Sequence, residues 1–149
     1  MTAKTILLAE DDPNDLELTL AALAENRLAN DVVVVRNGAE TLDYLYRRGA
    51  FADRPPGQPV LILLDLKMPK VDGLEVLREV KSDPGLRTIP VVVLTSSREE
   101  QDLIEGYRLG VNAYVVKPVH FDQFAERIKQ LGLFWMLINE APPRSGRGG

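Results

Sequence analysis

Five short apolar stretches recur along the chain, and each is separated from the next by a segment long enough for a helix. They cover residues 5–9, 32–35, 60–64, 91–94 and 113–116. Valine, isoleucine and leucine follow one another in these stretches instead of alternating with polar residues, as in parallel strands that are covered on both faces. Because strands that alternate with helices are typical of α/β proteins, the sequence predicts an α/β fold with a mostly or wholly parallel sheet.

The segments between these strands carry the signals of helices. Asp12 and Pro13 form an acidic, proline-led start for a helix that we expect to end near Arg27, with Asp12 as its N-cap. Two stretches do not fit a minimal strand and helix repeat: residues 49–59, which are rich in proline and predict an exposed loop, and the tail after residue 140. The other predicted helices cover residues 39–48, 73–81 and 99–109, and a fifth begins at Phe121. We therefore expect a doubly wound sheet of five strands flanked by five helices.

Length and composition restrict the classes of protein that this chain can belong to. Its 149 residues fit one domain, which we expect to cover residues 1–140, and a disordered tail over residues 141–149. The 22 acidic and 18 basic residues give a net charge of −4, which disfavours direct nucleic-acid binding. The absence of cysteine excludes disulfides and thiolate metal sites, and the single His120 excludes a histidine-rich metal site. We find no signal peptide and no apolar run long enough to cross a bilayer, so we expect a cytoplasmic protein without membrane contact.

Polar side chains follow four of the five predicted strands. Glu10 and Asp11 follow the first, Asp65 the third, Thr95 the fourth and Lys117 the fifth. Because the carboxyl ends of parallel strands share one edge of the sheet, we expect these groups to converge. Repulsion among three carboxylates is relieved by a hard dication with oxygen ligands, and Mg²⁺ fits best. An aspartate beside Mg²⁺ can attack phosphorus while a lysine neutralises the transferring oxygens, so the pattern indicates phosphate chemistry.

Four ordered sequence blocks resemble the receiver domains of bacterial two-component response regulators. They are ILLAEDD at residues 6–12, LDLKMP at residues 64–69 followed by Asp72-Gly73, VLTS at residues 93–96, and Lys117-Pro118. The spacings of 30 residues from Asp65 to Thr95 and 22 residues from Thr95 to Lys117 also agree with the family. The resemblance covers about the first 130 residues and implies the flavodoxin-like receiver fold with strand order 2-1-3-4-5.

The resemblance also implies a ligand set and a phosphoacceptor. Asp65 would take a phosphoryl group from a histidine of a sensor kinase. Asp11 and Asp65 would bind Mg²⁺ directly, the backbone carbonyl of Lys67 would be a further ligand, and Glu10 would act through water. Glu10 stands where many members of the family have aspartate.

A switch is implied in the same way. Lys117 would bridge the phosphoryl oxygen and the acidic site, and Thr95 would couple phosphorylation to a rotation of Tyr114. From the residues alone, Tyr114 is equally well explained as a half-buried aromatic side chain of the fifth strand. His120, which follows a turn, is better explained as an exposed side chain than as a phosphodonor.

A narrower resemblance is to the single-domain regulators paired with bacterial and cyanobacterial phytochromes. It rests on residues 44–49 (YLYRRG), the long loop that follows them, and the Phe134-Trp135 extension of the last helix. It implies a phytochrome-like sensor histidine kinase as partner. Phe134, Trp135 and Leu137 belong to a helix with apolar groups around much of its surface, which favours a homodimer through this carboxyl-terminal face. The same cluster could instead cover the edge of its own sheet.

Two other functions compete with a single-domain regulator that acts by protein contact or by phosphorelay. One is a Mg²⁺-dependent phosphohydrolase with an aspartyl nucleophile; Lys67 stands where haloacid-dehalogenase-type hydrolases have a second aspartate, which counts against it. The other is an interaction module that works without phosphorylation, which the complete set of acids and lysine disfavours. We therefore expect a phosphorylated signalling protein and no enzyme, beyond slow loss of its own phosphoryl group.

Overall fold

Five parallel strands form the single sheet of the computed structural model, which describes residues 5–26, 31–68, 70–95, 113–117 and 119–130. Their order across the sheet is β2-β1-β3-β4-β5, so the predicted topology is confirmed. The strands are β1 (Thr5–Ala9), β2 (Asp31–Val35), β3 (Leu61–Asp65), β4 (Val91–Thr95) and β5 (Ala113–Val116). Each lies within one residue of its predicted position.

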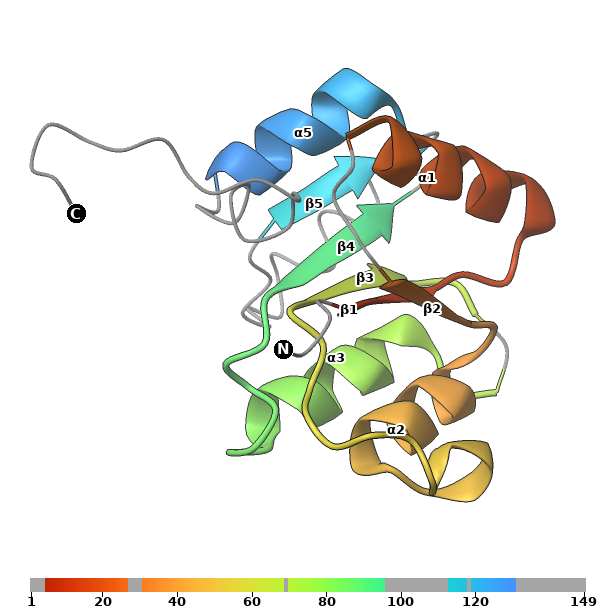
Figure 1. The fold of residues 1–149 in the computed structure, drawn as a ribbon, viewed down its shortest axis with the longest axis vertical. Coiled ribbons are helices and arrows are strands. Elements are labelled where there is room, and N and C mark those ends of the chain that lie inside the picture. Colours follow the sequence, from red (N-terminus) through yellow and green to blue (C-terminus); the bar gives the residue numbers. More distant parts are fainter. Residues whose placement is uncertain (1–4, 27–30, 69, 96–112, 118, 131–149) are drawn as a thin grey trace, which may run out of the picture.

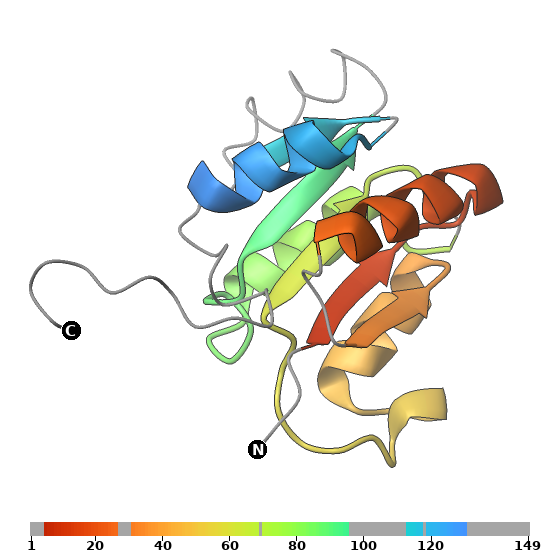
Figure 2. The same ribbon diagram turned by 45° about the horizontal axis from the view of Figure 1, so that its top comes forward.

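Helices cover both faces of this sheet (Figure 1). α1 (Pro13–Asn26) and α5 (Phe121–Gln130) lie side by side on one face, and α2 (Gly38–Tyr46) and α3 (Gly73–Ser82) lie on the other. The turned view in Figure 2 shows the same layers, with α1 and α5 brought forward. The helix predicted over residues 99–109 and the predicted tail at 141–149 lie outside the described residues. None of the helices in the described ranges is long and apolar enough to span a membrane.

Successive residues of each central strand enter two different cores. In β1, Leu7 and Ala9 pack toward α2 and α3, while Ile6 and Leu8 pack toward α1 and α5. The same alternation recurs in β3 and β4, and all these side chains are buried. Both faces of these strands pack into apolar cores, which explains the continuous apolar runs in the sequence; the buried polar side chains Asp65 and Thr95 stand only at the strand ends.

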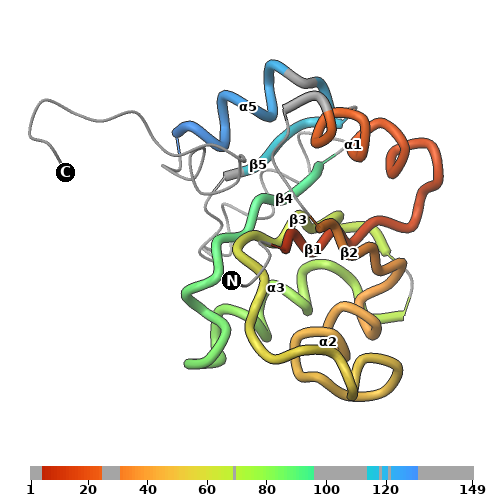
Figure 3. The backbone as a smooth tube through the Cα atoms, viewed as in Figure 1, coloured from red at the N-terminus to blue at the C-terminus, as the bar shows by residue number. Residues whose placement is uncertain are grey.

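Each of the first three helices begins with a side chain that accepts backbone N–H groups of its first turn. Asp12 accepts from residues 14 and 15, Asn37 from Glu40, and Asp72 from Glu75, so the predicted N-cap at Asp12 is confirmed. The smooth trace in Figure 3 shows that these helices start close to the ends of β1, β2 and β3. Their N-termini therefore line the edge of the sheet at which the strands end.

The second helix ends two residues earlier than predicted, at Tyr46 instead of Arg48. Arg47 adopts a left-handed conformation (φ 55°), and side chains of the following loop bind the carbonyls of the last turn. The Arg54 Nε donates to the Tyr44 carbonyl at 2.7 Å, and its guanidinium lies 4.2 Å from the Tyr44 ring centroid. The loop predicted over residues 49–59 opens with a short 3₁₀ turn, Gly49–Phe51. Local composition could not reveal these contacts, because they come from residues up to ten positions away.

Gly38, the first residue of α2, leaves no room for a side chain. A Cβ at this position would lie 1.8 Å from the carbonyl oxygen of Val71, in the loop between β3 and α3. We predict that Gly38→Ala lowers the free energy of unfolding by about 1–3 kcal/mol, because either α2 or this loop must shift. Equilibrium urea denaturation measures the change.

Gly85→Ala is the matched control, because its Cβ would approach only the Asp83 side chain, at 3.3 Å. We expect this substitution to change the free energy of unfolding by less than about 0.5 kcal/mol. Equal losses in the two variants would contradict the assignment of the close approach at Gly38.

Candidate functional site

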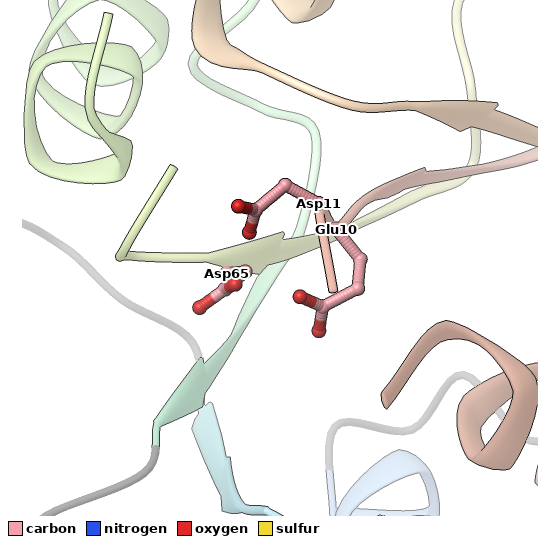
Figure 4. Close-up of side chains that lie close together, drawn as sticks. All are labelled: Glu10, Asp11 and Asp65. Atoms are coloured by element: carbon pink, nitrogen blue, oxygen red, sulfur yellow. The ribbon is translucent and has the colours of Figure 1, made fainter. Parts of the chain in front are cut away.

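Three carboxylates gather where β1 and β3 end. One ligand oxygen each of Glu10, Asp11 and Asp65 lies within 4.8 Å of the others. Figure 4 shows the three side chains, two from the segment after β1 and one from the end of β3, directed toward a common space. The register explains the convergence, because Ala9 pairs with Leu64, so that the next residues, Glu10 after β1 and Asp65 at the end of β3, lie side by side where both strands end. The strand-end prediction is confirmed for these residues.

Two of these acids are withdrawn from water. Glu10 is completely buried and Asp65 is 2% exposed. The Glu10 N–H donates to the Val35 carbonyl at 3.0 Å and continues the β1–β2 ladder by one residue, which fixes Glu10 beneath the site. The Lys67 N–H donates to Asp65 Oδ1 at 3.2 Å, whereas the Lys67 side chain is exposed. Where a phosphohydrolase of the type considered above needs a second acid, this chain presents an exposed lysine.

Lys117, one residue beyond β5, supplies the positive charge of the site. Its Nζ lies 3.3 Å from Glu10 Oε1, 3.3 Å from Asp65 Oδ2 and 2.9 Å from Asp15 Oδ2. The lysine side chain is only 10% exposed. Its backbone N–H donates to the Thr95 carbonyl, at 2.6 Å, and so ties it to the end of β4. One ammonium group therefore joins the ends of β1 and β3 to the first turn of α1.

Burial and charge shift the proton affinities of both Glu10 and Lys117. Burial, then the hydrogen bond and the charge of Asp65, raise the pKa of Glu10 to about 8; Lys117 opposes this rise without cancelling it. Burial by itself would lower the pKa of Lys117, but the hydrogen bond to Asp15 and the charges of Asp65 and Glu10 outweigh it and raise that pKa. The protein without metal thus tends to keep a proton on Glu10, and its lysine stays charged.

The remaining predicted site residues are placed as follows. Thr95 is completely buried at the end of β4, next to the acidic cluster in strand order. Tyr114 is half-buried in β5 and packs against the core under α2 and α3. His120 is exposed, as expected. The predicted interface residues Phe134, Trp135 and Leu137 lie outside the described residues.

Asp15 is the site residue that the sequence reasoning missed. It lies in the first turn of α1 and makes the shortest of the three ion pairs of Lys117. Its position four residues after Asp11 was the available signal, because a residue in the first turn of the helix that follows β1 can reach back to the strand end. The distance from β5 to α1 cannot be obtained from the sequence.

The donor set suits a small, hard dication. Carboxylate oxygens are the ligands that Mg²⁺ prefers, and it completes its octahedral shell with water. Glu10, Asp11 and Asp65 offer such oxygens, and the single charge of Lys117 does not balance those of Asp11, Asp65 and Asp15 even while Glu10 keeps its proton. The acidic cluster is therefore compatible with Mg²⁺.

Known proteins match this chain over most of its length. The family described as response regulator receiver domain matches residues 6–129. Response regulator Rcp1 of Synechocystis sp. is 38% identical over 133 residues, which are 89% of either chain. A solved structure is described as the Mn²⁺-bound form of response regulator Rcp1. It is 37% identical to the present chain, with a TM-score of 0.73, and the match covers 94% of the present chain and 99% of that one.

Two further solved structures are also similar. The bacteriophytochrome response regulator AtBRR is 61% identical, with a TM-score of 0.87, over 94% of this chain and all of its own. The cyanobacterial phytochrome response regulator RcpA, described as phosphorylated, is 42% identical, with a TM-score of 0.74, over 95% of this chain and all of its own. From a family match over most of its length and relatives of this identity, the chain belongs to the response regulator receiver domains of two-component signalling.

Proposed function

We propose that this chain accepts a phosphoryl group on Asp65 from a histidine of a sensor kinase, with Mg²⁺ bound beside it. The observation that carries the proposal is the surroundings of Asp65: oxygens of Glu10 and Asp11 lie within 4.8 Å, and the Lys117 Nζ lies 3.3 Å from its Oδ2. A carboxylate in these surroundings lies next to both a possible cation site and an ammonium group. That arrangement suits phosphoryl transfer better than structural capping.

The transfer follows from this arrangement. A carboxylate oxygen of Asp65 attacks phosphorus and forms an O–P bond while the P–N bond to the donor imidazole breaks, and the electron pair of that bond stays on the imidazole nitrogen. Asp11, Asp65 and the Lys67 carbonyl, with Glu10 acting through water, would hold Mg²⁺, which would supply positive charge at the phosphoryl oxygens. Lys117 binds a phosphoryl oxygen, and the buried position of Asp65 limits access of water to the product.

The change at Asp65 would reach the rest of the sheet through Thr95 and Tyr114. Thr95 ends the strand next to β3, where its hydroxyl can donate to a phosphoryl oxygen. Tyr114 belongs to the next strand and pairs in register with Val93. A movement of Thr95 toward the phosphoryl group alters the space beside Tyr114, and this is the switch that we propose.

We further propose a phytochrome-like histidine kinase as the phosphodonor. AtBRR and RcpA are described as response regulators of a bacteriophytochrome and of a cyanobacterial phytochrome, and both match this chain over almost its whole length. Output by protein contact or by phosphorelay, in the cytoplasm, fits this role. A homodimer through Phe134, Trp135 and Leu137 stays a prediction.

The first prediction concerns the phosphoacceptor. With Mg²⁺ and a small donor such as acetyl phosphate, the wild-type protein is expected to gain one phosphoryl group by intact-mass spectrometry, and Asp65→Asn is expected to gain none. Asp72→Asn is the matched control, because it removes a carboxylate from the same loop while asparagine still caps α3. Labelling that persists in Asp65→Asn would move the acceptor elsewhere.

The second prediction concerns the metal ligands. A ligand that binds only the folded state stabilises it by mass action, by about 2.7 kcal/mol at a concentration about a hundred times Kd. Mg²⁺ should therefore raise the melting temperature of the wild-type protein, and Asp11→Asn should lose most of this rise. Asp12→Asn, a change in the adjacent residue that caps α1, should keep it. An unchanged response in Asp11→Asn would refute the ligand set.

The third prediction concerns pH. The pKa of Glu10 rises from 4.5 to about 8 on folding, so the folded protein keeps a proton that the unfolded chain releases. The stability from this proton is complete below about pH 4.5 and declines as the pH rises toward about 8, above which it is lost. Without metal, the free energy of unfolding of the wild-type protein should fall over this range relative to that of Glu10→Gln, as urea denaturation at several pH values would measure. Parallel profiles for the two proteins would show that Glu10 does not titrate in this way.

A further inference from the structure

Lys117 forms ion pairs with three carboxylates, of which two belong to the acidic cluster and one does not. Glu10 and Asp65 belong to the acidic cluster that can hold a metal ion, and Asp65 is the proposed phosphoacceptor. Asp15 is outside that cluster, and its distance to the Lys117 Nζ, 2.9 Å, is shorter than the 3.3 Å of the other two contacts. Only one of the three contacts is therefore independent of the metal and of phosphorylation.

Loading the site changes the other two contacts. A cation among the acids attracts the oxygens of Glu10 and Asp65, which weakens their hold on the ammonium group. Phosphorylation converts the Asp65 carboxylate into an acyl phosphate and places the negative charge on the phosphoryl oxygens, so that one of these oxygens must take the place of Asp65 Oδ2 as a partner of the Lys117 ammonium group. During both events Asp15 is the one unchanged acceptor.

Asp15 is also well fixed. It lies in the first turn of α1, where the helix dipole favours a carboxylate, and the Asp12 side chain caps this turn by accepting the N–H of Asp15 at 2.9 Å. The helix packs on α5 and on the core beneath it through Leu16 and Leu23. The Asp15 side chain is 28% exposed, whereas the Lys117 side chain is 10% exposed, so the Asp15 carboxylate lies closer to solvent than the ammonium group does.

We propose that Asp15 is a positioning residue: its carboxylate anchors the Lys117 ammonium group at the mouth of the site so that one N–H donor stays directed at the phosphoryl group on Asp65. The inference rests on the proposed function and adds to it a contact between α1 and the end of β5. It assigns to Asp15 a part in the chemistry without contact to the reacting atoms.

Affinity for beryllofluoride, a mimic of the phosphoryl group, tests the inference. In a ¹⁹F NMR titration of the full chain at saturating Mg²⁺, Asp15→Asn should bind about three- to fivefold more weakly than the wild type, the size expected for one partly exposed ion pair. Asp15→Glu, which keeps a carboxylate within reach of Lys117, should recover the wild-type affinity to within about twofold. The ¹⁵N resonance of the Lys117 ammonium group should be visible in the wild type and in Asp15→Glu with beryllofluoride bound, and it should be lost through exchange with water in Asp15→Asn.

Glu17→Gln is the control for charge, because Glu17 is exposed two residues further along the same helix and loses one negative charge in the same way. Its affinity for beryllofluoride should equal that of the wild type. Unchanged or tighter binding by Asp15→Asn would overturn the inference, as would equal losses in Asp15→Asn and Glu17→Gln. A wild-type protein that does not bind beryllofluoride would instead overturn the proposed function, and the inference with it.

Discussion

The site depends on one ammonium group placed among buried acids. Glu10 and Asp65 are almost completely withdrawn from water at neighbouring strand ends, where the cost of desolvating two like charges is several kcal/mol for each isolated ion. Lys117 reduces this cost because its Nζ contacts both, and the proton that Glu10 tends to keep reduces it further. The strand order makes this possible, since β5 and β1 end at the same edge although they are far apart in the sequence.

The crowding of negative charge lowers the stability of the metal-free protein, and it also suits the site to a cation. Negative charge that is only partly balanced attracts a dication, and a dication next to a carboxylate and a lysine stabilises a phosphoryl group. Replacing these acids by apolar residues would make the metal-free protein more stable and remove its chemistry, a trade common at functional sites. The cost is confined to the edge, because the strands below it are buried in two continuous apolar cores.

Regular patterns in the sequence predicted what is periodic or local in the fold. The apolar runs predicted five parallel strands, because each strand is covered on both faces. The ends of parallel strands share one edge of the sheet, and this rule predicted that Glu10, Asp11 and Asp65 lie close together. The early end of α2 and the contact of Asp15 with Lys117 were missed, because both depend on side chains from another part of the chain. Contacts of that kind follow from the packed structure and have no periodic signal.

The contacts of Lys117 at the end of β5 determine which parts of the sheet a change at Asp65 can affect. The Lys117 backbone N–H donates a hydrogen bond to the Thr95 carbonyl, and this bond couples the movements of the ends of β4 and β5. Successive residues of β5 face opposite sides of the sheet: Val115 packs toward α1 and α5, while Tyr114 packs toward α2 and α3. In the switch proposed above, a displacement of Lys117 or Thr95 by a phosphoryl group would therefore be transmitted along β5 to Tyr114, on the face away from α1. The contact of Asp15 would limit that displacement, because it holds the ammonium group next to a helix on the other face.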